Sequence, residues 1–367
     1  MKKREIRYKV SPWLHIYPSG NKAGVLIAED FFNKKSFQFD ESVFLFTLNF
    51  CSKLRSKNDI LTYLKSEHKV TQREAKLILD QLLTKKLISG DNSPNVEAER
   101  KTKYWIKYGW NDALNFHIAI KDYPFLDYET LKAKQVEDDL MRDYMATNPV
   151  PRIYKEYNNT KKIPLEKEFS SMDDVDLRKL LIEEVFDYRA QKKPLTKKQV
   201  SNLLFYTFGK MGTVEFTPQG EFLLKTSPSG GARHPIEAYP IIIDSEVKKG
   251  VYHYSVKKNA LEEILPQVNI DEIKELIFEL KTNPEFPIRM IILLSAVFPR
   301  SMWRYREPRS YRVILHDMGH ILETMKIVSK AFGLKTYFGH GFQDDKLEKF
   351  LGINGSEESM LKFAVIG

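Results

Sequence analysis

Cysteine is nearly absent from this chain of 367 residues, in which Cys51 is the single example. A disulfide framework and a cysteine-rich metal site are therefore excluded. No apolar run approaches the roughly 18 residues needed to cross a membrane. The charged start at residues 1–5 is not followed by an apolar segment. We therefore expect a cytoplasmic protein with no membrane partner.

Several common catalytic motifs are also missing. No Gly-x-Gly-x-x-Gly run follows a candidate strand and no Walker loop occurs, so neither a Rossmann domain nor a nucleotidase is indicated. No serine or cysteine lies in a nucleophile elbow. His316 and His320 have the spacing of a zinc-binding pair, but Gly319 weakens that helix and no third ligand is marked. We therefore expect no metal.

Length and charge set the remaining limits. A chain of 367 residues is long enough for two domains, and 42% hydrophobic residues allow a sizeable core. The formal net charge of +9 and a pI near 9.1 indicate an anionic partner. A phosphate-bearing cofactor or an acidic peptide fits that charge. Nucleic acid is not favoured, because no basic stripe with interleaved aromatic residues is present.

The most informative stretch is residues 225–244, KTSPSGGARHPIEAYPIIID. Residues 229–231 have little side-chain bulk, so their backbone can approach a ligand closely. Arg233 and His234 then place a cation and a titratable imidazole beside that turn. Residues 238–243 are apolar and rich in isoleucine, which predicts a strand buried on both faces.

A glycine-bearing polar loop at the end of a buried strand is a frequent ligand site. The structural alternative is a tight turn whose glycines only relieve backbone strain. The arginine, histidine and proline at fixed offsets before an apolar strand favour the ligand loop over that alternative.

This loop resembles the flavin loop of the FMN-dependent nitroreductase-like superfamily. Within it, Ser227–Pro235 is most similar to the streptolysin-type peptide dehydrogenases and azoline oxidases, which have lanthipeptide dehydroamino-acid reductases as close relatives. The resemblance covers residues 180–367 closely and residues 1–120 loosely. It implies an α+β fold, with a mixed sheet flanked by helices, that binds FMN. It also implies a homodimer in which both chains line each site.

The catalytic domain is expected over residues 179–367. Its predicted elements are a helix over Leu181–Tyr188, a helix over Lys197–Phe205 capped by Thr196, a buried strand over Ile288–Ala296, a long helix over about Ser310–Phe332 and a closing strand over Leu361–Ile366.

Residues 1–90 are expected to form a winged-helix-like domain. Alternation of apolar and polar residues predicts three strands, Tyr8–Tyr17, Gly24–Ala28 and Ser36–Phe39. Three helices are expected after them. Asp40 is a candidate cap for the first, and Thr71 with Glu74 makes a capping box for the third. The pattern resembles the peptide clamp of enzymes that tailor ribosomally made peptides, in which a leader peptide adds a strand. DNA binding or simple packing remains the alternative.

Residues 91–178 are expected to connect the two domains. Their first part, Asp91–Lys101, is polar and predicts a linker. The aromatic run from Tyr104 to His117 predicts a helical arm that packs the N-terminal module on the catalytic one. The peptide dehydrogenases have a similar Trp-Gly-Trp segment.

The resemblance also implies a set of FMN-binding residues. In the family an Arg-Arg-Ser type of grip holds the phosphate, and only Arg189 matches it here. Arg233 is a candidate for the phosphate or for the N1–O2 edge of the ring. The residues expected to bind FMN are Arg189, Ser227, Pro228, Ser229, Gly230, Gly231, Arg233, Tyr337, Phe338, Gly339 and His340.

His234 is the first candidate for a proton-transfer residue, because an ordinary imidazole pKa of about 6.5 suits that work near neutral pH. The structural alternative is a histidine that only hydrogen-bonds the turn. Arg233 and Tyr305 are the other catalytic candidates, and Arg304 is a weaker candidate for substrate contact.

The direction of the reaction stays open. Azoline oxidases typically carry a Lys-Tyr pair, and Arg233-His234 is taken to occupy that place here. Arginine cannot act as a base at ordinary pH. That departure admits the reverse reaction, the reduction of a dehydroamino acid in a peptide.

The expected function is therefore FMN-dependent tailoring of a precursor peptide, whose leader binds the N-terminal domain, with other peptide-modifying enzymes as further partners. Two alternatives remain. The first is a reductase of small nitro compounds or quinones. The second is a winged-helix DNA-binding regulator with a flavin-sensing domain.

Overall fold

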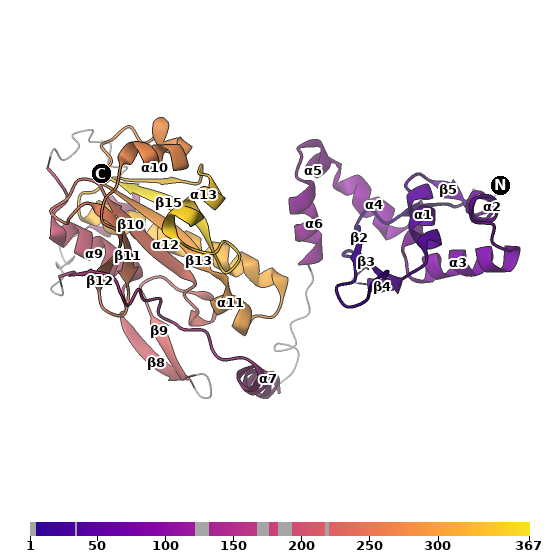
Figure 1. The fold of residues 1–367 in the computed structure, drawn as a ribbon, viewed down its shortest axis with the longest axis horizontal. Helices are drawn as coiled ribbons and strands as arrows, with labels where there is room; N and C mark the ends of the chain where they lie inside the picture. Colours follow the sequence, from indigo (N-terminus) through magenta and orange to yellow (C-terminus); the bar gives the residue numbers. More distant parts are fainter. Residues whose placement is uncertain (1–4, 34, 122–131, 167–175, 183–192, 217–219) are drawn as a thin grey trace. The chain divides into compact units, whose positions relative to one another are not determined.

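The computed structural model describes residues 5–33, 35–121, 132–166, 176–182, 193–216 and 220–367. The chain divides into two compact units, residues 1–124 and residues 125–367 (Figure 1). Each unit has its own apolar core. In the described part of the chain, no helix combines the length and the apolar character needed to span a bilayer.

The N-terminal unit contains two small antiparallel sheets. One has the strand order β5-β1-β6 and the other is the meander β2-β3-β4. The expected first strand is in fact two strands, because Pro12 lies in a turn between them. The strands are β1 (Arg7–Val10), β2 (Leu14–Pro18), β3 (Leu26–Asp30), β4 (Lys35–Phe39), β5 (Arg55–Ser56) and β6 (Ile88–Gly90).

Three helices pack with these strands around a common core that includes Leu64, Leu79 and Cys51. They are α1 (Ser42–Phe50), α2 (Lys57–His68) and α3 (Gln72–Thr84). The capping box of Thr71 and Glu74 is confirmed at the start of α3. The N-cap of α1 is Glu41, not Asp40, and it makes no side-chain capping bond.

The segment after the N-terminal core is more helical than its polar sequence suggests. Pro94 starts a helix where a linker was expected, since proline suits the first helical turn. The aromatic run forms two short helices, because Gly109 has a φ of 76° and breaks them apart. The helices are α4 (Pro94–Lys101), α5 (Lys103–Lys107), α6 (Asn111–Ala119) and, after the undescribed residues, α7 (Ala133–Thr147).

The C-terminal unit is built on a seven-stranded sheet of order β14-β15-β13-β10-β11-β12-β7. The α+β class is confirmed. Neighbouring strands in this sheet run antiparallel throughout, where a mixed sheet was expected. The strands are β7 (Lys162–Pro164), β10 (Ile236–Ile242), β11 (Gly250–Ser255), β12 (Ala260–Leu265), β13 (Met290–Val297), β14 (Thr336–Gly339) and β15 (Glu358–Ile366).

Helices cover both faces of this sheet (Figure 1). Helices α9 (Lys197–Phe208) and α12 (Tyr311–Ala331) pack on one face, and α10 (Ile270–Leu276) and α13 (Asp344–Leu351) pack on the other. Thr196 caps α9 through a box with Gln199, as expected. The remaining elements are α8 (Leu177–Ile182), the hairpin β8 (Gly212–Phe216) and β9 (Gly220–Leu224), α11 (Phe298–Arg304), and the 3-10 turns η1 (Gly230–Ala232), η2 (Phe278–Lys281) and η3 (Pro308–Ser310).

A charged network is buried at the end of the sheet on the face that α10 and α13 also cover. His253 of β11 lies between two carboxylates, with Nε2 at 2.9 Å from Glu237 and Nδ1 at 3.1 Å from Glu262. Arg300 of α11 lies 2.6 Å from the other oxygen of Glu237. Burial opposes the charge on His253, but the bonds to Glu237 and Glu262 outweigh it and raise the His253 pKa. The folded state therefore favours an imidazolium ion at this position.

This arrangement predicts a pH-dependent stability that depends on His253. Because its pKa is raised on folding, its contribution is fully present below about pH 6.5 and is lost as the pH rises through the folded pKa. His253→Gln is expected to lower the free energy of unfolding by about 3 kcal/mol in weak acid and by less near about pH 9. Denaturation of both proteins across that range measures the difference. His316→Gln, at an exposed position, is the control. A constant difference between wild type and His253→Gln would contradict the assignment.

Candidate functional site

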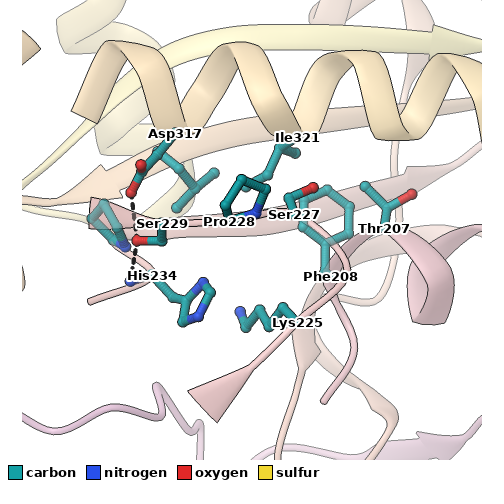
Figure 2. Close-up of a pocket in the computed structure, with 11 residues that line it drawn as sticks. Thr207, Phe208, Lys225, Ser227, Pro228, Ser229, His234, Asp317 and Ile321 are labelled. Atoms are coloured by element: carbon teal, nitrogen blue, oxygen red, sulfur yellow. Dashed lines mark hydrogen bonds between the residues drawn. The ribbon is translucent and has the colours of Figure 1, made fainter. Parts of the chain in front are cut away.

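The expected ligand loop connects β9 to β10 and is fastened to helix α12. The Ser229 hydroxyl donates a hydrogen bond of 2.5 Å to Asp317 and accepts one of 2.8 Å from the His234 amide. The Gly230 amide donates to the second oxygen of Asp317 at 3.1 Å. Figure 2 shows Asp317, Ser229 and His234 in this line. The buried Asp317 carboxylate thus binds the start of the turn directly, and the Ser229 hydroxyl connects it to the end of the turn at His234.

The two glycines of the loop allow a close approach of side chains from other elements. A Cβ atom on Gly230 would lie 2.1 Å from Cγ1 of Val313, so a side chain there would require a shift. Gly231 has a φ of 58°, which non-glycine residues rarely adopt. A Cβ atom on Gly231 would also lie 2.6 Å from the Tyr305 hydroxyl. The structure therefore places the Tyr305 hydroxyl close to the loop at Gly231.

The loop presents backbone rather than serine hydroxyls to the outside. The Ser227 hydroxyl lies 2.7 Å from the Thr324 hydroxyl of α12, and the Ser229 hydroxyl is bound to Asp317. Pro228 and Gly231 are exposed. A ligand on the outer side of the loop would meet the chain at Pro228 and Gly231.

Arg233 is held between two aromatic rings. Its guanidinium carbon lies 4.4 Å from the centre of the Phe222 ring and 5.7 Å from that of Trp303. Its Nε donates to the Gly231 carbonyl at 3.0 Å. Burial lowers the Arg233 pKa from its ordinary value, but a guanidinium stays charged at any ordinary pH. The loop therefore carries a fixed cation on an apolar support.

His234 is buried and neutral. Burial, reinforced by the nearby Lys225 cation, lowers its pKa to about 3. Its Nε2 lies 2.9 Å from the Leu223 carbonyl, and Arg300 donates to the His234 carbonyl at 2.9 Å. An imidazole with this pKa cannot supply a proton near neutral pH, so the ordinary pKa assumed from the sequence does not apply. Its bonds match the structural alternative, a histidine that fixes the turn.

Lys225 is a residue of this site that the sequence did not single out. It lines, with His234 and Asp317, a cavity of about 10 Å³ beside the loop. Burial lowers its pKa to about 8. The only sequence signal was its place four residues before Ser229, which says nothing about burial. Figure 2 shows the Lys225 ammonium and the His234 ring directed toward the same space.

The other expected residues lie elsewhere in the unit. Tyr337, Phe338 and Gly339 belong to β14, which β15 and β13 separate from β10, so they do not line the cavity beside the loop. His340 follows β14 directly. Arg189 lies outside the described residues.

The turn after β14 is organised by Glu279, which the sequence did not reveal. The Glu279 carboxylate accepts hydrogen bonds from the Tyr337 hydroxyl, from the His340 amide at 3.0 Å and from the Gly341 amide at 2.6 Å. The bond to Glu279 raises the Tyr337 pKa to about 12. Glu279 is 61 residues from His340 along the chain, so no local pattern could have identified it.

These residues fit a flavin on the outer side of the loop, not within the cavity. A volume of about 10 Å³ holds one water molecule and excludes a three-ring system. The outer side offers the exposed Gly231, and the largely buried Arg233 guanidinium is bonded to the Gly231 carbonyl. A backbone turn and a cation are the groups that a flavin's polar edge or phosphate needs. Among the described residues, no group of three or more histidine, cysteine, aspartate or glutamate side chains could hold a metal ion.

Sequence comparisons place the C-terminal half in a known family. Residues 188–367 match the nitroreductase family. The trifolitoxin-processing protein TfxB of Rhizobium leguminosarum bv. trifolii is 35% identical over 170 residues, which is 46% of each chain. A candidate nitroreductase of Methanocaldococcus jannaschii, MJ1384, is 24% identical over 52% of this chain and 90% of its own. The microcin B17-processing protein McbC of Escherichia coli is 24% identical over 44% of this chain and 58% of its own.

The match to TfxB thus spans less than half of that protein's length. Among solved structures, the E. coli microcin synthetase McbBCD complex has a TM-score of 0.42 at 18% identity, covering 65% of this chain and 98% of that one. Because this TM-score is below 0.5, it adds nothing to the sequence matches.

The contact between Gly230 and Val313 gives a test of the loop geometry. Gly230→Ala is expected to lower the free energy of unfolding by about 1–3 kcal/mol, because the added methyl group overpacks the space against Val313. Chemical denaturation measures the loss. Gly230→Ala combined with Val313→Ala should recover part of it.

Gly319→Ala is the matched control, since a Cβ atom at that position would meet no neighbouring atom within 4 Å. In α12 this change should raise stability by about 0.5–1 kcal/mol. A Gly230→Ala protein as stable as wild type would contradict the packing described here.

Proposed function

We propose that this chain, in which residues 188–367 form a nitroreductase-family domain, is an FMN-dependent oxidoreductase that tailors a ribosomally made peptide. The observation that carries the proposal is the 35% identity of the catalytic half to a trifolitoxin-processing protein. The match to a microcin B17-processing protein supports the same substrate class. The anchored loop with its cation supports the cofactor.

FMN, when bound, supplies hydride transfer, and the chain supplies its binding and the handling of protons. The backbone of residues 228–231, which is exposed at Pro228 and Gly231, and the Arg233 cation would hold the polar parts of the flavin. Arg189 is proposed for its phosphate. The anchor to Asp317 keeps the loop in one shape, so that little freedom is lost on binding.

A homodimer is part of the proposal. The turn of Tyr337 to His340 is remote from the loop in the strand order of one subunit. A dimer in which both chains line each site would let this turn cover a ring bound to the loop of the partner. The N-terminal unit is proposed to bind the leader of the precursor peptide, with the edges of the β2-β3-β4 meander available for strand addition. Cytoplasmic localisation and further peptide-modifying partners remain part of the same proposal.

A second candidate function is the reduction of small nitro compounds or quinones. The match to MJ1384, which covers 90% of that protein, favours it. The two functions share the flavin and differ in the size of the substrate.

The cofactor is tested through Arg233. Arg233→Gln is expected to weaken FMN binding by about tenfold or more, because a charge-assisted bond to the flavin is lost. Titration of the apoprotein with FMN, followed by flavin fluorescence, measures the affinity. Arg142→Gln removes an exposed arginine of α7 and should leave it unchanged. Equal affinities for wild type and Arg233→Gln would remove Arg233 from the flavin site, and a wild type that binds no FMN would refute the cofactor.

The substrate is tested by mass spectrometry of precursor peptides encoded beside the gene. Incubation with the FMN-loaded protein should change a peptide by two hydrogen atoms. A loss of two hydrogens identifies azoline oxidation, and a gain identifies dehydroamino-acid reduction. The same peptide without its leader is the control and should react more slowly. Unchanged peptides together with rapid turnover of a nitrofuran would favour the second candidate function.

A further inference from the structure

The C-terminal unit also contains a larger cavity, at the edge of its sheet. The cavity has a volume of about 590 Å³ and is lined by residues of helix α12 and of the edge strand β14. Thr336 and Phe338 of β14 contribute to the lining and share one face of that strand. A volume of this size is typical of a site for a cofactor or a small molecule. Phe338 is also one of the residues that the sequence assigns to FMN.

The α12 residues of this cavity lie on a different face of the helix from those that hold the loop. Gly319, Glu323 and Lys326 line the cavity and follow one another at the spacing of one helix face. Asp317 and Thr324 bind the loop before β10. At 3.6 residues per turn the two sets point in different directions. Within one subunit, α12 therefore separates the cavity from the loop.

Gly319 is a glycine that the packing of this chain does not require. It lies inside α12, a helix of 21 residues, where glycine is less favourable than alanine. A Cβ atom at Gly319 would meet nothing of the surrounding fold within 4 Å. A glycine in such a place allows a group from outside the fold to approach the helix backbone closely. Because Gly319 lines the cavity, it indicates a bound group there.

The charge of the cavity suits an anion. Among the described residues that line it, Lys326, Lys330 and Lys335 are balanced by one carboxylate, that of Glu323. Lys330 donates a hydrogen bond of 3.0 Å to the Leu180 carbonyl. Lys326 lies 3.7 Å from Glu323, and its side chain is 45% exposed. An exposed pair of this kind is weak, so the Lys326 ammonium is available to an anionic ligand.

We propose that Lys326 binds the phosphate of FMN in this cavity and that Gly319 allows the flavin ring to approach α12. The inference rests on the proposed function and deepens it. Only Arg189 matches the phosphate grip of the family, and Lys326 supplies a second cation. The half-buried Phe338 and the buried Leu334 give the cavity the apolar surface that a ring system needs.

The cavity and the loop would form one site only across the proposed homodimer. Since α12 separates the two within one subunit, a flavin in this cavity would meet the loop of the partner subunit. The cavity would then hold the phosphate and one side of the ring, and the loop of the partner subunit would hold the polar edge of the ring.

The phosphate contact is tested by comparing FMN with riboflavin, which lacks the phosphate. Lys326→Gln should weaken FMN binding by about tenfold, because a charge-assisted contact is lost, and should leave riboflavin binding unchanged. Titrations of the apoprotein, followed by flavin fluorescence, measure both affinities. The matched control is Lys346→Gln, which removes an exposed lysine of α13 on the other face of the sheet. An unchanged FMN affinity, or an equal loss for FMN and riboflavin, would contradict the phosphate contact.

The ring contact is tested by Gly319→Leu. Leucine favours a helix and this position has space for it, so the free energy of unfolding should not fall. The new side chain would fill part of the cavity, and both FMN and riboflavin should bind about tenfold or more weakly. Chemical denaturation measures the stability, and the same titrations measure the affinities. Wild-type affinities for both flavins would overturn the approach of the ring to Gly319.

A second copy of the chain is the alternative group that would need Gly319. In that case Gly319→Leu would dissociate the apoprotein, and sedimentation would show a lower mass than for the wild type. Equal masses together with a weakened flavin affinity are expected, and a lower mass would overturn the ligand contact.

The failure of this inference is distinguishable from that of the proposed function. A wild type that binds FMN, with both variants binding it equally well, would overturn the roles of Lys326 and Gly319 alone. A wild type that binds neither flavin would overturn the proposed function and this inference with it.

Discussion

The bond between Asp317 and the 229–230 turn is the contact on which the site depends. Both carboxylate oxygens of Asp317 are used, one by the Ser229 hydroxyl and one by the Gly230 amide. Burial raises the Asp317 pKa, and these two bonds oppose that effect by favouring the ionised form. The Ser229 hydroxyl also accepts a hydrogen bond from the His234 amide. Asp317 of α12 therefore determines the backbone conformation of the turn from Ser229 to His234.

The loop is tied to the sheet as well as to α12. Arg300 donates to the His234 carbonyl and binds Glu237, which in turn holds His253. The end of the loop, β10 and β11 are thus joined through charged groups in a region of low dielectric constant, where each such bond is strong and each missing partner is costly. Lys225 lines the small cavity beside this network, and its pKa is lowered by burial and raised by the nearby Glu237.

Local signals in the sequence identified the helices α1 to α3, α9 and α12 and the strands β10, β13 and β15, but not β11, β12, α10 or α13. The boxes at Thr71 and Thr196 marked helix starts, because capping involves residues only three apart. The apolar run before Asp244 marked β10. The sequence did not show the burial of His234 or the contact of Glu279 with the turn after β14, because both depend on packing between distant segments. The sequence grouped the β14 residues with the loop, and in the strand order of the sheet two strands lie between β14 and β10.

The separation of β14 from the loop in the strand order has a physical consequence for the proposed flavin site. The cavity beside the loop admits only a water molecule, so a ring system would lie against the exposed residues Pro228 and Gly231. Sites for ligands of this size usually bury most of the ligand surface, and the loop of one subunit supplies only one wall. The β14 turn of the same subunit does not line the loop cavity. If a second copy of the chain supplies the covering wall, as in the proposed homodimer, flavin binding and dimer formation would stabilise each other.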